Sequence, residues 1–259
     1  QVNKYYDLAT SFYEFGWGQS FHFAPRCKGE SLTESLKRHE HFLALQLGLK
    51  AGQKVLDIGC GIGGPLREIS RFSKTSITGL NNNAYQIKRA RELTCDTGLE
   101  KTCNFVESEA WWMVCCMTDV FDPFNKEHQK IKEEIKVGDG LPDIRSTTKC
   151  LGALKQAGFE VMEEKDLTIE SPVLWYLPFD PPSHFSLSNF RATSTGRFVT
   201  RIMVTALEFL GLAPKGRTRV EGFLRKAAEG LVAGGKTGIF TPMYFFLVRK
   251  PASSNNSSA

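Results

Sequence analysis

A glycine-rich turn between an apolar run and an amphipathic run limits the folds open to this chain more than any other feature. The stretch LDIGCGIGGPLREI occupies residues 56–69. Its apolar run ends in Asp57, glycines then recur as far as Gly64, and Pro65 suits the first turn of a helix. Such glycines let a ligand approach the backbone closely, and the free N–H groups of a helix N-terminus favour a carboxylate or a phosphate. The turn therefore predicts a strand, a ligand-binding loop and a helix.

The segments around this turn extend it into an α/β fold. Ser31 and Glu34 have capping-box spacing at the start of a predicted helix. Alternating strands and helices are typical of a doubly wound, Rossmann-like parallel sheet. Up to Val106, strands are predicted over 54–59, 76–80 and 104–106, and helices over 31–47, from Pro65 onward and over 84–97.

The alternation becomes irregular after Val106. The apolar run at about 111–116 is the next predicted strand. The remaining pattern predicts helices over about 125–137, 147–157, 187–211 and 218–233, and strands near 159–167 and 243–250. Residues 252–259, ASSNNSSA, are typical of a disordered tail.

Composition excludes several classes of protein. Hydrophobic residues make up 41% of the 259 residues and charged residues 24%, which is ordinary for a globular protein and argues against global disorder. The net charge of +5 is spread along the chain, so we expect no nucleic-acid partner and at most attraction to an anionic membrane surface. The seven cysteines form no CxxC pair, which favours reduced thiols over a disulfide framework or a metal site. No apolar run reaches the roughly 20 residues that span a bilayer.

Two cofactors fit the glycine turn. Gly59, Gly61 and Gly64 satisfy the GxGxxG pattern of dinucleotide binding, but that pattern expects an acidic residue after the second strand, where the sequence reads GLNNN. DIGCGIG instead matches the acid-x-Gly-x-Gly-x-Gly pattern of S-adenosylmethionine turns, which we favour. The candidate cofactor-binding residues are Asp57, Gly59, Cys60, Gly61, Gly63, Gly64, Asn81 and Asn82.

Several stretches together resemble one enzyme family. YYDLATSFYEFGWGQSFHF, VLDIGCGIGGP, TGLNNNAYQI and GLPDIRST look like the sterol C-24 methyltransferases, and the N-terminal wording is most similar to the plant cycloartenol-type enzymes. WYLPFD, FSLSNFR, AAEGLVAGGK and IFTPMYFFLVRKP resemble the C-terminal domain of the same family. The resemblance implies transfer of a methyl group from S-adenosylmethionine to the side-chain double bond of a sterol such as cycloartenol.

By resemblance, the aromatic residues 5–23 form the sterol-binding region. From the residues alone, this segment lacks a clear period and could equally be a core-covering loop or short helix. An alkene attacked by a methyl donor becomes a carbocation, which aromatic faces stabilise without reacting with it. The expected lining residues are Tyr13, Phe15, Trp17 and Phe21, and the expected catalytic residues are Tyr13, Glu14 and His22.

The resemblance also implies a division of the chain. It predicts an N-terminal sterol-binding segment over 1–29, a methyltransferase core over 30–167 with a returning strand at 243–250, a C-terminal sterol methyltransferase domain over 168–242 and a tail over 251–259. The chain departs from the family after Val106, where the family's fourth strand and a second sterol motif are absent. Because the fourth strand of a doubly wound sheet lies beside the first, we expect an incomplete sheet. The alternative to an enzyme is therefore an inactive, shortened isoform that only binds cofactor or sterol.

A sterol substrate has consequences for location and partners. The family works at the endoplasmic reticulum, so the resemblance implies peripheral contact with that membrane, or a cytoplasmic protein that draws its substrate from it. Homo-oligomerisation is a further expectation.

Overall fold

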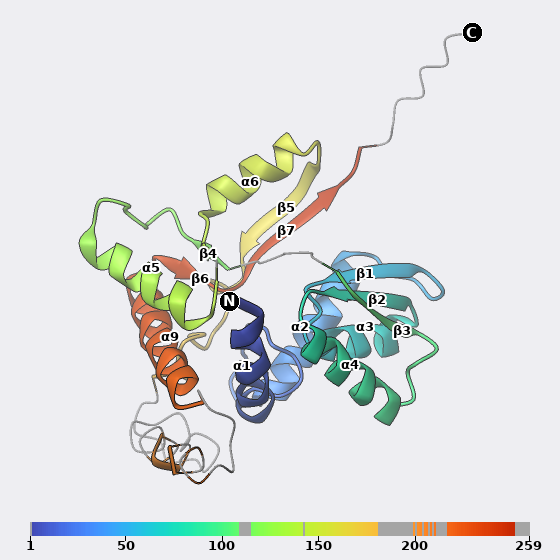
Figure 1. Cartoon of the computed structure of the whole chain (residues 1–259). Helices are drawn as coiled ribbons and strands as arrows, with labels where there is room; N and C mark the ends of the chain where they lie inside the picture. Colours follow the sequence, from blue (N-terminus) through green and yellow to red (C-terminus); the bar gives the residue numbers. More distant parts are fainter. Residues whose placement is uncertain are drawn as a thin grey trace.

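The computed structural model describes residues 2–108, 115–141, 143–180 and 217–251, together with isolated positions between 199 and 210. A three-stranded sheet with its helices forms one side of the molecule in Figure 1, and the later elements form the other. The first helix, α1 (Val2–Gly16), lies between these two groups (Figure 1). None of the described helices is long and apolar enough to cross a bilayer.

The first group is the start of the predicted doubly wound sheet. Its strands are β1 (Lys54–Ile58), β2 (Ser76–Asn81) and β3 (Cys103–Glu107), which are parallel and lie in the order β1-β2-β3. Helices α3 (Gly64–Ser73) and α4 (Ala84–Asp96) pack against β2 and β3. The core beneath these helices contains Cys60, Leu66, Ile77, Ile87, Ala90, Cys103 and Phe105.

The second group is built on two antiparallel strand pairs. β4 (Cys116–Met117) pairs with β6 (Phe240–Thr241), and β5 (Glu160–Asp166) pairs with β7 (Tyr244–Arg249). Its helices are α5 (Lys126–Gly138), α6 (Thr147–Gln156) and α9 (Arg217–Thr237), and α5 packs along α9 (Figure 1). The larger hydrophobic core lies here, and Trp175 and Phe240 belong to it.

Most predicted elements are confirmed within a few residues. Helix α2 (Leu32–Gln46) begins at the predicted capping box, in which Ser31 accepts from the backbone N–H of Glu34 and the Glu34 carboxylate accepts from Ser31. The predicted helix over 187–211 lies largely outside the described residues, as does the tail after residue 251.

The N-terminal aromatic segment corrects one expectation. The sequence left open a loop or a short helix, but α1 is a helix of 15 residues, longer than expected, and it contains most of the aromatic run. It ends where Trp17 and Gly18 donate backbone hydrogen bonds to the carbonyl of Tyr13, and Gly18 adopts a φ of 104°. Because that backbone conformation strains residues with a Cβ, Gly18 ends the helix.

The sheet is incomplete at β1, as expected. Within the described residues, no strand pairs with the outer edge of β1, and β4 pairs with β6 instead. Leu56 is 54% exposed, Ile58 40% and Val106 46%, although central strands of doubly wound sheets are buried on both faces. Of the predicted strand over 111–116, residues 111–114 lie outside the described part. Among the described residues, nothing covers the outer edge of β1 or one face of the sheet, which explains why these apolar side chains are exposed.

Candidate functional site

The glycine turn leaves backbone donors without acceptors. Gly59, Gly61 and Gly63 have φ values of 78°, 54° and 77°, which residues with a Cβ rarely adopt. The N–H groups of Gly59 and Cys60 donate to the carbonyl of Leu80. In the described part of the chain, no residue accepts a hydrogen bond from the N–H of Gly61, Ile62 or Gly64. These N–H groups adjoin the N-terminus of α3, an arrangement that binds carboxylates and phosphates.

The segment after α1 lies directly on this turn. A Cβ added to Gly64 would collide with the backbone carbonyl of Gln19 and lie 2.5 Å from Ser20 Oγ. A Cβ added to Gly61 would lie 3.5 Å from the ring of Phe21. The segment after α1, which belongs to the motif that resembles a sterol site, therefore lies against the turn that resembles a cofactor site.

A buried arginine fastens the two segments together. Arg67 on α3 is 2% exposed and donates to the carbonyl of Ile62 at 2.8 Å and to Gln19 Oε1 at 2.9 Å. Burial lowers the pKa of Arg67 to about 10. The guanidinium stays charged near neutral pH and holds the turn and the N-terminal segment in fixed relation.

Replacing this arginine should loosen the site. We expect Arg67→Met to lower the free energy of unfolding by about 2 kcal/mol, because the Ile62 carbonyl and the Gln19 amide lose a buried donor. Arg71→Met is the matched control on the same helix, since its guanidinium is 45% exposed and reaches Glu68 only at 3.6 Å. We expect this change to cost under about 1 kcal/mol. Chemical denaturation measures both; equal losses would contradict the fastening role of Arg67.

The carboxylate of Asp57 has no hydrogen-bond partner among the residues that the structure describes. In the described part of the chain, its oxygens accept no hydrogen bond, and burial raises its pKa to about 6. His22 opposes that shift and Glu40 adds to it. Asp57 is half-buried, and a carboxylate without a partner among the described residues is suited to a cationic ligand group.

The aromatic residues expected to line the site lie in different places. Phe21 lies beside the turn, and the Tyr13 ring lies next to Phe21 with ring centroids 5.6 Å apart. Trp17 stacks on Phe179 at 5.5 Å and donates from its indole N–H to the carbonyl of His22. Phe15 was expected to line the pocket, but it is 66% exposed because it lies on the outward side of α1. The lining role expected for Phe15 stays a prediction.

The two expected polar partners are differently placed. His22 lies in the site, where its Nε2 is 3.0 Å from Glu40 Oε1 and its Nδ1 is 2.8 Å from the carbonyl of Phe23. Glu14 instead forms an ion pair with Arg89 on α4 at 2.7 Å. Two hydrogen bonds join this carboxylate to the guanidinium, and the catalytic role expected for Glu14 stays a prediction.

The asparagines after β2 have structural partners. Asn81 is buried and donates to Gln86 at 2.7 Å, and Asn83 caps α4 and donates to Asp7. Asn82 also has a partner and lies at the surface of the same loop. The predicted contact between these asparagines and a ribose stays a prediction.

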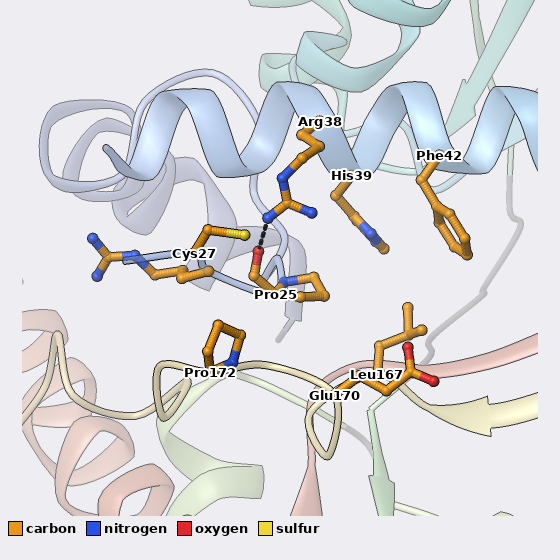
Figure 2. A pocket seen from close by; sticks show the side chains of 9 residues that line it. Pro25, Cys27, Arg38, His39, Phe42, Leu167, Glu170 and Pro172 are labelled. Atoms are coloured by element: carbon orange, nitrogen blue, oxygen red, sulfur yellow. Dashed lines mark hydrogen bonds between the residues drawn. The ribbon is translucent and has the colours of Figure 1, made fainter. Parts of the chain in front are cut away.

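A cleft lies close to His22. It is a cleft of about 180 Å³ between α2 and the loop after β5. Figure 2 shows His39 and Phe42 pointing into it from α2, with Leu167 and Glu170 on the opposite wall. Burial lowers the pKa of His39 to about 3, so the imidazole is neutral. The His39 ring lies 5.5 Å from that of His22, which places the cleft next to the site.

The sequence did not single out several residues next to the turn: Gln19, Ser20, His39, Glu40 and Arg67. Gln19 and Ser20 lie within the stretch over 5–23 but are not aromatic, and Glu40 lies in an ordinary helical stretch. Glu40 is 2% exposed and accepts from Ser20 Oγ at 2.6 Å. A buried acid on the inner face of a predicted helix was the one signal that could have indicated it.

Comparisons of the sequence identify relatives that span nearly all of this chain. A family model described as sterol methyltransferase C-terminal matches residues 187–252. The chain is 60% identical over 292 residues to the cycloartenol-C-24-methyltransferase of Arabidopsis thaliana, covering 96% of this chain and 87% of the relative. It is 40% identical to the sterol 24-C-methyltransferase ERG6 of Saccharomyces cerevisiae, covering 99% and 80%. An alignment of 292 residues exceeds the 259-residue chain, so the plant relative has residues without a counterpart here.

Solved structures agree on the fold. The cyclopropane synthase MmaA2 of Mycobacterium tuberculosis superposes with a TM-score of 0.72 at 14% identity, covering 96% of this chain and 97% of that one. Geranyl diphosphate C-methyltransferase of Streptomyces coelicolor A3(2) superposes with a TM-score of 0.60 at 13% identity, covering 96% and 98%. The identities and coverage of the curated relatives show that this chain belongs to the sterol C-24 methyltransferase family.

Proposed function

We propose that this protein transfers a methyl group from S-adenosylmethionine to the side-chain double bond of a sterol of the cycloartenol type. The observation that carries the proposal is the contact between the glycine turn and the aromatic segment, in which Phe21 and Gln19 lie against Gly61 and Gly64. A methyltransferase that acts on an alkene needs the cofactor turn and an apolar aromatic wall at one place.

The residues at the turn fit the amino-acid end of the cofactor. The unpaired N–H groups of Gly61, Ile62 and Gly64 match a carboxylate, and the unpaired Asp57 carboxylate matches an ammonium group. When bound, S-adenosylmethionine supplies an electrophilic methyl group. The dinucleotide alternative loses support, because β2 ends in asparagines that the protein itself engages.

The aromatic wall fits the substrate. A sterol side chain is apolar, and methylation of its double bond creates positive charge on carbon. The faces of Tyr13 and Phe21 can stabilise that charge by about 0.5–2 kcal/mol each. They also exclude water, which would otherwise trap the cation as an alcohol.

The alternative of an inactive isoform rests on the incomplete sheet at β1. The described residues retain the turn, the aromatic wall and the ties between them, and the related enzymes give no support to a binding-only protein. We therefore favour the enzyme. Because its substrate resides in membranes, we further propose peripheral contact with the endoplasmic reticulum membrane.

The test is a labelled-methyl assay. Purified full-length protein is incubated with methyl-labelled S-adenosylmethionine and either cycloartenol or the same sterol with a saturated side chain. We expect label in cycloartenol alone, because only an alkene can attack the methyl group. Cofactor binding without label in any sterol would refute catalysis and support the isoform alternative. Preferential binding of a nicotinamide dinucleotide would refute the cofactor assignment.

A further inference from the structure

A carboxylate distant in sequence lies behind the aromatic wall. Asp139 follows α5, and its side chain is hydrogen-bonded to Tyr13 on α1. The Tyr6 hydroxyl, two helical turns earlier on the same face of α1, donates to the Asp139 backbone carbonyl at 3.1 Å. The α1 helix thus contacts Asp139 at two positions.

Tyr13 links this carboxylate to the cofactor turn. Its ring centroid lies 5.6 Å from that of Phe21, and Phe21 lies 3.5 Å from the Cβ position of Gly61. A continuous path therefore runs from the turn through the aromatic wall and the Tyr13 hydroxyl to Asp139. The function proposed above requires a proton acceptor at this wall, because the methylated sterol must lose a proton to become an alkene again.

We propose that the Asp139 carboxylate, acting through the Tyr13 phenol, takes up the proton that leaves the methylated sterol. This inference rests on the proposed function. A sterol C–H bond breaks and its electron pair forms the new double bond. The proton passes to the Tyr13 oxygen while the Tyr13 hydroxyl proton passes to Asp139. Charge balances, since the sterol cation and the carboxylate both become neutral, and Asp139 later returns the proton to water.

The surroundings of Asp139 suit a proton acceptor. Burial raises the pKa of Asp139 to about 7, and the Tyr13 hydrogen bond opposes that rise. The titratable groups that face it are Tyr6 and Tyr13 from α1 and Cys115 from the segment before β4, and the pKa values of Tyr6 and Cys115 are also raised by burial. From α9, the neighbouring contact is the apolar Ala227 against Gly138. An acceptor with a pKa near the working pH both takes and releases a proton readily.

The test separates proton removal from a structural role. With full-length protein, S-adenosylmethionine and cycloartenol, we expect wild-type kcat to rise with pH through about 7 as Asp139 becomes ionised. Asp139→Asn should lower kcat about 100-fold, remove that pH dependence and divert product to the methylated alcohol. Asp139→Glu should restore part of the rate together with its pH dependence. Asp143→Asn, four residues along and paired with Lys132 at the surface, is the matched control and should behave as wild type.

A second measurement needs no turnover. In an infrared titration, the band of the protonated Asp139 carboxyl should disappear with a midpoint near pH 7, and it should be absent in Asp139→Asn. In Tyr13→Phe the midpoint should move to higher pH, because the lost hydrogen bond favoured the ionised form. An unshifted band in Tyr13→Phe would overturn the relay. Unchanged kcat, pH profile and product in Asp139→Asn would also overturn it while leaving the proposed function intact. Absence of methyl transfer by wild type, with the band shift present, would refute the proposed function alone.

Discussion

Asp57→Asn should stabilise this protein and at the same time prevent it from binding its cofactor. The folded protein holds Asp57 at a pKa of about 6, above the ordinary value of 3.8, because burial disfavours the charged form. A raised carboxyl pKa means that stability is lost as pH rises through about 6. Near pH 7 the asparagine removes that penalty, so we expect the free energy of unfolding to increase by about 2 kcal/mol. The gain should shrink as the pH falls towards 4.

Cofactor affinity should change in the opposite direction. The asparagine cannot pair with an ammonium group, so S-adenosylmethionine should bind about 100-fold more weakly, as measured by calorimetric titration. Asp96→Asn, at the exposed end of α4, is the control and should change both quantities little. If Asp57→Asn bound the cofactor as tightly as wild type, Asp57 would not be a cofactor ligand.

Gly64→Ala should be among the most damaging single-methyl changes in the chain. Gly64 has a helical backbone, so its constraint is steric rather than conformational. The added Cβ would overlap the Gln19 carbonyl and approach Ser20 Oγ to 2.5 Å, and Gln19 is also held by its hydrogen bond from Arg67. We expect the free energy of unfolding to fall by about 3 kcal/mol, with loss of cofactor binding as the N-terminal segment leaves the turn.

A glycine in open space supplies the control for that change. Gly152 lies inside α6, and a Cβ there would meet nothing within 4 Å. Gly152→Ala should raise stability by about 0.5–1 kcal/mol, since alanine favours a helix. Thermal and chemical denaturation of the two variants side by side measures the difference. A loss at Gly64 no larger than about 0.5 kcal/mol would show that the segments do not touch in solution.

The elements that the sequence predicted are those that local chemistry determines. The capping box at Ser31 and the strand, glycine turn and helix from Lys54 to Ser73 depend on neighbours within a few residues. The sequence left the N-terminal segment open between a loop and a short helix, because the aromatic run over 5–23 has no clear period. Phe15 faces outward, whereas Tyr13 contacts Phe21.

The parts of the site that were missed depend on contacts across long stretches of chain. Asp139 meets Tyr6 across 133 residues, and Arg67 meets Gln19 across 48. A periodicity within one segment contains no information on such pairs. Likewise, the sequence did not indicate the ion pair of Glu14 with Arg89, 75 residues away. The family resemblance pointed to the segment over 5–23, and the fold shows which of its side chains contact the turn and which pack elsewhere.

The backbone amides of the glycine turn offer the most direct test of the whole account. In an amide NMR titration with S-adenosylmethionine, the signals of Gly61, Ile62 and Gly64 should shift saturably, and those of Ser20 and Phe21 should shift with them. Such a result would place the methyl donor between the turn and the aromatic wall. Saturable shifts confined to other parts of the chain, or none at these amides, would contradict the assignment of this site.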